Sequence, residues 1–274
     1  MAWTKIEYTR EQVNVAGNIL IGNKTVDNVI AENAAYQIIN NWRTAHNFPL
    51  NTFQARLRKK ANEVNNNCLV VQRIKRLASI KLKLERYKKM KLSQIQDIGG
   101  CRAIMKTISD VNKLVKLYLH ESKGVKHKLA SEDNYINNPK PSGYRGVHLV
   151  YKYQSGRNQH YQDLKIEIQI RTVLQHAWAT AVETVGAFTA QSLKSSQGEK
   201  DWLQFFKLMG SAMAIKENSP IIPDTPKNLT DLKREISKYE SKLKVKKHLK
   251  AFSLSLSILD DDKLDMPDAY YYLL

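Results

Sequence analysis

The sequence has few of the residues that build disulfide-rich secreted domains or anchor a chain in a membrane. Only two of its 274 residues are cysteines, Cys68 and Cys101, which excludes a disulfide framework and a cysteine-based metal site. The apolar runs are far shorter than the roughly 20 residues that span a bilayer, and the opening MAWTKIEYTREQ does not resemble a signal peptide. We therefore expect a folded, cytoplasmic protein without a membrane segment.

Acidic residues are scarce relative to basic ones. The chain has 44 lysines and arginines against 26 aspartates and glutamates, which gives a formal net charge of +18. Such an excess favours polyanionic ligands such as nucleotides, nucleic acid or anionic lipid, although a basic surface also serves solubility alone. The charge therefore limits the class of ligand and leaves its identity open.

The pattern of apolar residues predicts an α/β fold with helical flanks. The expected helices lie over 27–47, 52–66, 68–89, 111–122, 173–190, 199–214 and 227–250. The expected strands lie near 101–107, 126–132, 147–154 and 163–172. The last of these contains DLKIEIQIRT, in which polar and apolar residues alternate with a period of two.

Three prolines, Pro220, Pro223 and Pro226, predict a domain boundary. We expect residues 1–218 to form the main domain, with a helical N-terminal part. Residues 219–274 are expected to carry a basic helix and the start of an appended element. The final DAYYYLL is typical of a strand that has just begun, so we expect either a truncated chain or a small appended element.

The stretch RIKRLASIKLKLERY places cations at helical spacing. Lys75, Ser79 and Lys83 recur every four residues, and Arg76 and Arg86 fall on the same side, within an arc of about 100°. Because clustered cations repel one another, such a row suits a polyphosphate lying along the helix. The alternative is a solvated helix face, which is the more common fate of charged residues.

Two acidic residues lie at predicted strands. Asp97 precedes IGGCR, where paired glycines let the backbone approach a ligand closely. Glu167 shares one face of its strand with Lys165, Gln169 and Arg171. Two carboxylates from neighbouring strands suit Mg²⁺, which takes one or two carboxylates together with substrate phosphates. The alternative is a solvent-facing strand on which Glu167 pairs with a neighbouring cation.

The stretch NPKPSGYRGVHLVYKY, residues 138–153, sets an aromatic ring between prolines, glycines and basic residues. Tyr144 would offer a flat face to a nucleobase, with Lys140, Arg145 and His148 near its phosphates. The alternative is a tyrosine packed over a turn.

Together these stretches resemble the synthetase domain of the RelA/SpoT alarmone family. RIKRLASIKLK is similar to the family's R-x-K-x-x-x-S-I-x-x-K, DIGGCR to its D-x-x-G-x-R, DNYINNPKPSGYRGVH to its guanosine-binding loop, and EIQIRT with His176 to E-x-Q-x-R-T-x-x-x-H. The motifs stand in the family's order over residues 73–176. The resemblance implies a nucleotidyltransferase-like mixed β-sheet flanked by helices. It also implies a pyrophosphokinase that moves the β,γ-pyrophosphate of ATP to a nucleoside 3′-hydroxyl.

The resemblance also implies a role for each matching residue. Asp97 would bind Mg²⁺, and Glu167 would complete the metal site or take the proton from the attacking hydroxyl. The residues expected to bind ATP are Arg73, Lys75, Ser79, Lys83 and Arg102. The residues expected to contact the acceptor are Lys140, Tyr144, Arg145, His148, Gln169, Arg171 and His176, with Tyr144 stacked on its base.

The sequence also departs from the family pattern. Ser142 stands where asparagine is usual, Gly146 stands where serine is usual, and an extra residue separates Asp133 from Tyr135. No His-Asp dipeptide occurs, and the N-terminus is too short for the family's hydrolase domain, so a stand-alone synthetase is implied. The stretch LQHAWATAVETVG resembles toxic small members of the CapRel type, which pyrophosphorylate the 3′-CCA end of tRNA and carry a C-terminal antitoxin segment that senses phage.

Two acceptors therefore remain open. A tRNA acceptor end fits the charge of +18. It would make the chain a toxin that blocks translation, of toxin–antitoxin or phage-defence type. Such a toxin would be restrained by its own C-terminal segment or by a separate antitoxin. Its expected tRNA contacts are Arg56, Arg58, Lys59 and Lys60, with a second basic cluster over 242–250. GDP or GTP, the acceptor of an alarmone synthetase, fits the intact Lys-Pro-x-Gly-Tyr loop. The retained Asp97 and Glu167 argue against a third reading, a nucleic-acid-binding module without catalysis.

Overall fold

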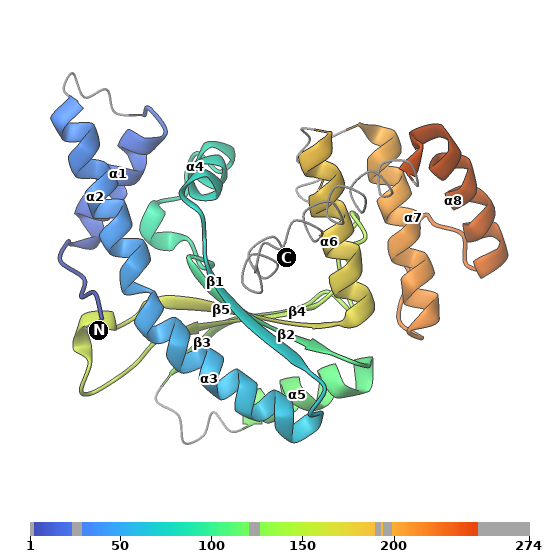
Figure 1. The fold of residues 1–274 in the computed structure, drawn as a ribbon, viewed down its shortest axis with the longest axis horizontal. Coiled ribbons are helices and arrows are strands. Elements are labelled where there is room, and N and C mark those ends of the chain that lie inside the picture. The colour runs from blue at the N-terminus through green and yellow to red at the C-terminus, as the bar shows by residue number, and fades with distance from the viewer. Residues whose placement is uncertain (1–2, 24–28, 121–126, 190–192, 194–198, 246–274) are drawn as a thin grey trace, which may run out of the picture. The chain divides into compact units, whose positions relative to one another are not determined.

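The computed structural model describes residues 3–23, 29–120, 127–189, 193 and 199–245 (Figure 1). Its helices are α1 (Arg10–Leu20), α2 (Val29–Ala45), α3 (Asn47–Val64), α4 (Leu77–Arg86), α5 (Ile108–His120), α6 (Val173–Phe188), α7 (Lys200–Lys216) and α8 (Leu229–Leu243), with short 3-10 turns at Leu92–Gln94 and Gln159–Tyr161. Its strands are β1 (Leu69–Ile74), β2 (Gly99–Met105), β3 (Lys128–Asn134), β4 (Val147–Lys152) and β5 (Lys165–Thr172).

The chain folds into two compact units. The first comprises residues 1–133 and 146–172 and contains the sheet with α1 to α5. The second comprises residues 134–145 and 173–274 and contains α6 to α8. These units are structural, so the functional boundary that the prolines predict after residue 218 stays a prediction.

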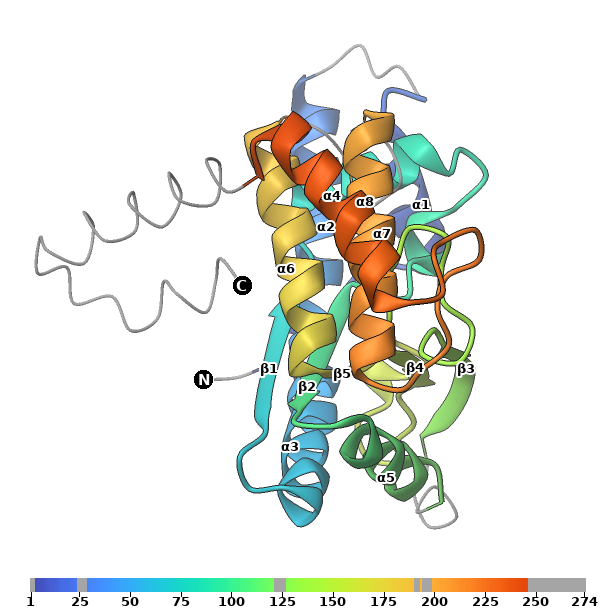
Figure 2. The same cartoon turned by 90° about the vertical axis from the view of Figure 1, so that its right-hand side faces the viewer.

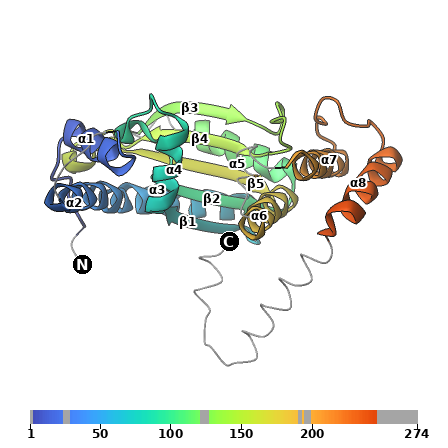
Figure 3. The same ribbon diagram turned by 90° about the horizontal axis from the view of Figure 1, so that it is seen from above.

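The five strands form one mixed sheet in the order β1-β2-β5-β4-β3, with β1 and β3 at its edges (Figure 3). β2 and β5 run parallel, whereas β1 pairs with β2 and β4 pairs with β5 in antiparallel fashion. The predicted α/β fold with a mixed sheet and flanking helices is confirmed.

Helices α3 and α5 cover one face of this sheet (Figure 1). Ile166, Ile168 and Ile170 of β5 point to this face and are fully buried, each worth about 1.5–3 kcal/mol of hydrophobic stabilisation. A Cβ added to Gly99 would lie 2.8 Å from Ile166 Cδ1 and 3.5 Å from His46 Cβ, so a side chain there would force the end of the Ile166 side chain to move. Alternation turns the residues between the isoleucines, Glu167 among them, to the opposite face.

The helix predicted over 68–89 is wrong in its first half. Residues Leu69–Ile74 form the edge strand β1, because the β-branched pair Val70 and Val71 favours a strand and β2 supplies hydrogen-bonding partners. Only Leu77–Arg86 is helical. The other predicted elements are confirmed, with ends shifted by a few residues. Beyond Val245, both the end of the last predicted helix and DAYYYLL lie outside the described residues.

Helix α1 was not predicted, although the sequence contains its signal. Thr9 accepts a hydrogen bond from the backbone nitrogen of Gln12 at 3.2 Å, and the Gln12 side chain accepts one from the Thr9 backbone at 2.9 Å. This reciprocal pair is a capping box, which the letters TREQ spell.

In the second unit, α7 packs against both α6 and α8 (Figure 2). The Trp178 indole nitrogen donates to the carbonyl oxygen of Phe206 at 2.9 Å. Gly143, which has a φ of +98°, lies so close to these residues that an added Cβ would be 2.8 Å from the Phe206 oxygen. The unit therefore requires glycine at this position of the turn. Among the described residues, none of the helices combines the length and the apolar composition that crossing a bilayer needs.

Candidate active site

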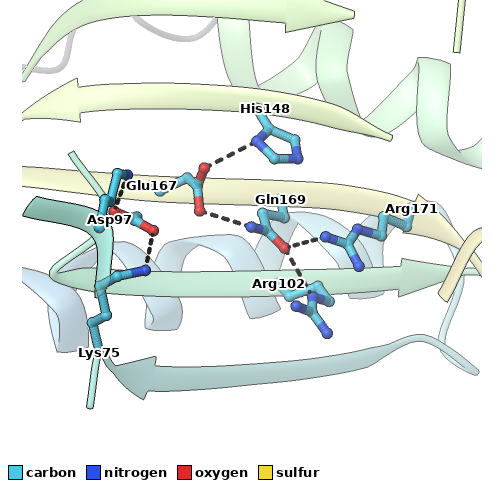
Figure 4. A network of polar contacts seen from close by, with 8 residues as sticks. Lys75, Asp97, Arg102, His148, Glu167, Gln169 and Arg171 are labelled. Carbon is cyan, nitrogen blue, oxygen red and sulfur yellow. Dashed lines mark hydrogen bonds and ion pairs between the residues drawn. The ribbon is translucent and has the colours of Figure 1, made fainter. Parts of the chain in front are cut away.

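Asp97 lies just before β2 and binds two lysines (Figure 4). The Lys75 ammonium donates to Asp97 Oδ2 at 2.7 Å, and the Lys83 ammonium donates to Oδ1 at 2.8 Å. Lys75 follows β1 and Lys83 lies in α4, so the turn from strand to helix brings both cations to one carboxylate. The predicted single-helix stripe is thereby corrected, because Lys75 and Arg76 precede α4.

These two lysines keep Asp97 ionised. Burial alone would raise the pKa of Asp97, but the Lys75 and Lys83 ammonium groups outweigh it and hold this pKa well below its usual range. Because the pKa is depressed in the folded state, the ion pairs contribute stability above the unfolded-state pKa of about 3.9. That contribution is lost as the pH falls through the folded-state value.

Glu167, in β5, has two polar neighbours on its own face of the sheet (Figure 4). His148 Nδ1 lies 2.9 Å from Glu167 Oε1, and the Gln169 amide nitrogen donates to Glu167 Oε2 at 2.7 Å. Burial would raise the pKa of Glu167, but the hydrogen bond and charge interaction with His148, helped by Gln169, lower it to about 2. Both carboxylate oxygens are therefore held, and the group is ionised.

Gln169 is itself oriented by two guanidinium groups. Arg102 Nε donates to Gln169 Oε1 at 3.1 Å, and Arg171 Nη2 donates to the same oxygen at 2.6 Å. Arg171 is only 1% exposed, whereas Gln169 and Arg102 are each 8% exposed. The predicted contact between Arg171 and the acceptor does not fit this burial, because the guanidinium is enclosed by protein.

The face of the sheet that carries Gly100, Arg102, Glu167 and Gln169 is called the site face below. In register across three strands, Arg73 pairs with Gly100 and Gly100 pairs with Glu167. Among the described residues, a Cβ added to Gly100 would meet one heavy atom, the Glu167 carbonyl oxygen at an ordinary 3.6 Å. Packing thus disfavours a side chain at 99 but not at 100, and the bare backbone at 100 allows a ligand to approach the site face.

Asp97 and Glu167 are the predicted donor set for the expected metal, and this role stays a prediction. The negative charge of Asp97 partly opposes the lowering of the Glu167 pKa. In the part of the chain that the structure describes, no three acidic, histidine or cysteine side chains gather as metal ligands. Two carboxylates nevertheless fit Mg²⁺, which completes its coordination with water and substrate phosphates. The two ammonium groups already at Asp97 show that this position attracts cations.

Tyr144 and Lys140, predicted to contact the acceptor, lie in the second unit. Tyr144 is 7% exposed and packs edge-on against Trp178 and Tyr135, with ring centroids 6.2 and 5.9 Å away. The exposed Lys140 ammonium lies 4.1 Å from the Tyr135 ring centroid and 5.4 Å from that of Tyr144. This packing favours the alternative of a tyrosine packed over a turn, and stacking on an acceptor base stays a prediction.

Arg145 holds the same turn from inside the second unit. It is 2% exposed, and its guanidinium donates to the carbonyl oxygens of Ile136 and Pro220 and to Ser219 Oγ. The predicted contact between Arg145 and acceptor phosphates therefore does not fit the structure. His176 lies half-buried on α6, and its role at the acceptor stays a prediction.

The four cations predicted to contact tRNA lie on α3 and differ in exposure. Lys60 is 9% exposed, and its ammonium binds both carboxylate oxygens of Glu63, at 2.9 and 3.2 Å. The Arg56 guanidinium lies 4.8 Å from the ring centroid of a buried tyrosine of α5. Arg58 and Lys59 are exposed. Arg58 and Lys59 are therefore the exposed members of the predicted patch on α3, and its contact with tRNA stays a prediction.

Comparison with known proteins supports one family. Residues 72–188 match the family model described as "Region found in RelA / SpoT proteins". GTP pyrophosphokinase YwaC of Bacillus subtilis (strain 168) is 36% identical over 115 residues, which cover 39% of this chain and 52% of that protein. The chain thus spans about half the length of the curated relatives it matches.

Solved structures share the fold. Small alarmone synthetase 2 of Bacillus subtilis aligns with a TM-score of 0.55 at 24% identity, covering 65% of this chain and 94% of that one. Small alarmone synthetase 1 of the same organism, solved with its product pppGpp, aligns with a TM-score of 0.52 at 23% identity, covering 63% and 89%.

Proposed function

We propose that this chain is an ATP-dependent pyrophosphokinase, because residues 72–188 match the RelA/SpoT family model and resemble curated pyrophosphokinases. In this reaction a nucleoside 3′-oxygen forms a bond to the β-phosphorus of ATP, the bond from that phosphorus to the α-phosphate oxygen breaks, and AMP and a proton leave. The observation that carries the proposal is an ionised Asp97 held by the cations Lys75 and Lys83, beside an ionised Glu167 held by His148 and Gln169. The naming of the curated relatives as GTP pyrophosphokinases supports the same reaction class.

On the donor side, the basic residues would bind the triphosphate. Lys75 and Lys83 would move from Asp97 to phosphate oxygens, and the exposed Ser79 on α4 would add a hydroxyl donor. Arg73 and Arg102, on neighbouring strands, would flank the adenine. Asp97 and Glu167 would then hold Mg²⁺, which supplies charge neutralisation to the transferred group when bound.

On the acceptor side, Glu167 would orient the attacking hydroxyl. With a pKa lowered to about 2, its carboxylate is always ready to accept a hydrogen bond but is a weak base. Pyrophosphoryl transfer requires alignment and charge neutralisation more than a strong base, so a fixed acceptor suffices.

For the acceptor we propose the 3′-CCA end of tRNA, supported by the net charge of +18 and by the exposed pair Arg58 and Lys59. The chain would then act as a toxin that blocks aminoacylation, restrained by its C-terminal segment or by a separate antitoxin. GDP or GTP is the second candidate, favoured by the names of the curated relatives and by the fold shared with the pppGpp-bound synthetase.

One labelling experiment tests the reaction and separates these acceptors. The protein is incubated with γ-³²P-ATP and either deacylated tRNA, GDP or GTP, and the products are resolved by gel and thin-layer chromatography. Label on tRNA supports the toxin, and label on a guanine nucleotide with release of AMP supports alarmone synthesis. Hydrolysis of ATP without transfer to any of the three would refute the proposed function.

The two adjacent glycines of β2 give a matched pair of variants. Gly99→Ala should destabilise the fold by about 1–3 kcal/mol, because its methyl group would overpack against Ile166. Gly100→Ala should leave thermal unfolding nearly unchanged and weaken binding of a non-hydrolysable ATP analogue roughly tenfold, because its methyl group projects where the ligand packs. Calorimetry of unfolding and of analogue binding measures both. Wild-type analogue affinity in Gly100→Ala would contradict ATP binding on the site face.

The exposed pair Arg58 and Lys59 predicts how the salt dependence of transfer differs between the two acceptors. Reversing Arg58 and Lys59 to glutamate should weaken tRNA modification and lower the slope of log K against log salt by up to ~0.9 for each lost phosphate contact. Transfer to GDP or GTP should hardly change, because a free nucleotide presents few phosphates. The control reverses Lys113 and Lys116, two exposed lysines of α5. Equal salt slopes for the patch and control variants would remove the patch from the tRNA proposal.

A further inference from the structure

Gln169 stands at the centre of a chain of hydrogen bonds on the site face (Figure 4). Its amide oxygen accepts from Arg102 at 3.1 Å and from Arg171 at 2.6 Å, and its amide nitrogen donates to Glu167 at 2.7 Å. Because a guanidinium can only donate, both bonds require the amide oxygen to face the arginines. The nitrogen must therefore face Glu167, and the orientation of the amide is settled by its partners.

The position of the Arg171 side chain also depends on a glycine of a neighbouring segment. Gly146, just before β4, has a φ of +145°, and a Cβ added there would lie 3.0 Å from Arg171 Cγ and 3.4 Å from its Nε. The glycine thus leaves the room that the arginine side chain occupies. A guanidinium only 1% exposed, enclosed in this way, contacts protein rather than ligand.

We propose that Gln169 and Arg171 are positioning residues that hold the Glu167 carboxylate in one orientation for pyrophosphate transfer. The inference rests on the proposed function and replaces the roles at the acceptor predicted for both residues. His148 holds Oε1 and Gln169 holds Oε2, so the carboxylate cannot rotate without breaking a hydrogen bond. A misplacement of about 1 Å can cost ~10²-fold in rate, so this restraint acts on catalysis rather than on ATP binding.

Gln169→Glu separates positioning from the alternatives. The new carboxylate keeps the size of the side chain and still accepts from Arg102 and Arg171, so the packing of both arginines is retained. The new carboxylate cannot donate to Glu167. One of its oxygens would face Glu167 Oε2, where the Gln169 amide N–H donates in the wild type. We expect kcat to fall about 10- to 100-fold, the usual cost of losing an orienting contact, while KM for ATP stays within about twofold.

Two further variants complete the design. Arg171→Lys keeps one cationic donor for the Gln169 oxygen and should retain more activity than Gln169→Glu, with the loss again in kcat. Gln175→Glu is the matched control, because Gln175 makes the same kind of contact elsewhere, donating to Glu217 at 2.9 Å in the second unit. Its kcat per folded molecule should equal that of the wild type.

A measurement without turnover tests the geometry directly. In ¹H–¹⁵N spectra, the Gln169 side-chain amide is assigned by its loss in Gln169→Glu, and it should exchange slowly and shift in Glu167→Gln. The inference would be overturned by a wild-type kcat in Gln169→Glu or by a loss confined to the KM of the acceptor. It would also be overturned if the Gln169 amide signal had the same chemical shift in Glu167→Gln as in the wild type. If the wild-type protein transferred no pyrophosphate, the proposed function would be refuted instead. The amide spectra alone would then show whether Gln169 holds the Glu167 carboxylate.

Discussion

Asp97→Asn is expected to lower pyrophosphate transfer by ~10²–10³-fold, the usual loss when one electrostatic stabiliser of a transition state is removed. Asparagine keeps the shape of the side chain but offers Mg²⁺ a neutral oxygen. It also leaves the Lys75 and Lys83 ammonium groups close together without the charge that now holds both. The variant should therefore lose activity and also about 1.5–3 kcal/mol of stability, the range for hydrogen bonds to charged groups.

Initial rates of label transfer and thermal unfolding measure the two losses separately. Asp110→Asn serves as the control, because its carboxylate accepts from Asn65 at 3.3 Å at the start of α5 and plays no part in the site. The difference in unfolding free energy between wild type and Asp97→Asn should also shrink in acid. The Asp97 ion pairs stabilise the wild type above the unfolded-state pKa, and this contribution is lost as the pH falls. Transfer by folded Asp97→Asn at more than a tenth of the wild-type rate would remove Asp97 from the metal site.

Lys83→Met is expected to change the affinities for metal and for nucleotide in opposite directions. In the free protein the Lys83 ammonium neutralises Asp97, so a metal ion that arrives alone must compete with it. Methionine removes that competitor, and Mn²⁺ alone should bind more tightly. Binding of a non-hydrolysable ATP analogue should weaken about 10- to 100-fold, because one charge-assisted hydrogen bond is worth roughly 1.5–3 kcal/mol.

Calorimetric titration with Mn²⁺ alone and with the analogue alone gives both affinities without turnover. Lys81→Met is the control, because Lys81 is exposed on the same helix and carries the same charge. If both affinities change as expected, metal and triphosphate would enter together, since the phosphates would draw the lysines away from Asp97 and so open it to the metal. Affinities that fall together for metal and analogue would show that Lys83 only supports the fold.

Much of the fold could be predicted from the chain alone. The alternation in DLKIEIQIRT identified β5 and the face that Glu167 occupies. The spacing of Lys75 and Lys83 was interpreted as one helix face, yet the two do meet, at Asp97, by a strand and a helix. The error over β1 arose because a short apolar run fits either element, and the pairing of β1 with β2 decides between them.

Sequence reasoning could not assign the partners of Glu167. The contact with His148 depends on the register of β4 against β5, in which Val150 lies opposite Glu167 and His148 opposite Gln169. A register shift of one residue would turn every side chain of the strand to the other face. No local pattern in the chain sets that register, so His148 was predicted at the acceptor.

What the sequence determined by itself was the chemistry available: a basic chain, two carboxylates near strands, spaced cations and four motifs in one order. Local spacing and residue type carry that information, because a carboxylate or an ammonium group keeps its charge in any fold. What only the tertiary structure decided was which of these side chains a ligand can reach. It buried Arg145 and Arg171, left Arg58 and Lys59 exposed, and left less room for a side chain at 99 than at 100. Burial depends on which distant segments pack together, and that is set by the whole core rather than by neighbours in the chain.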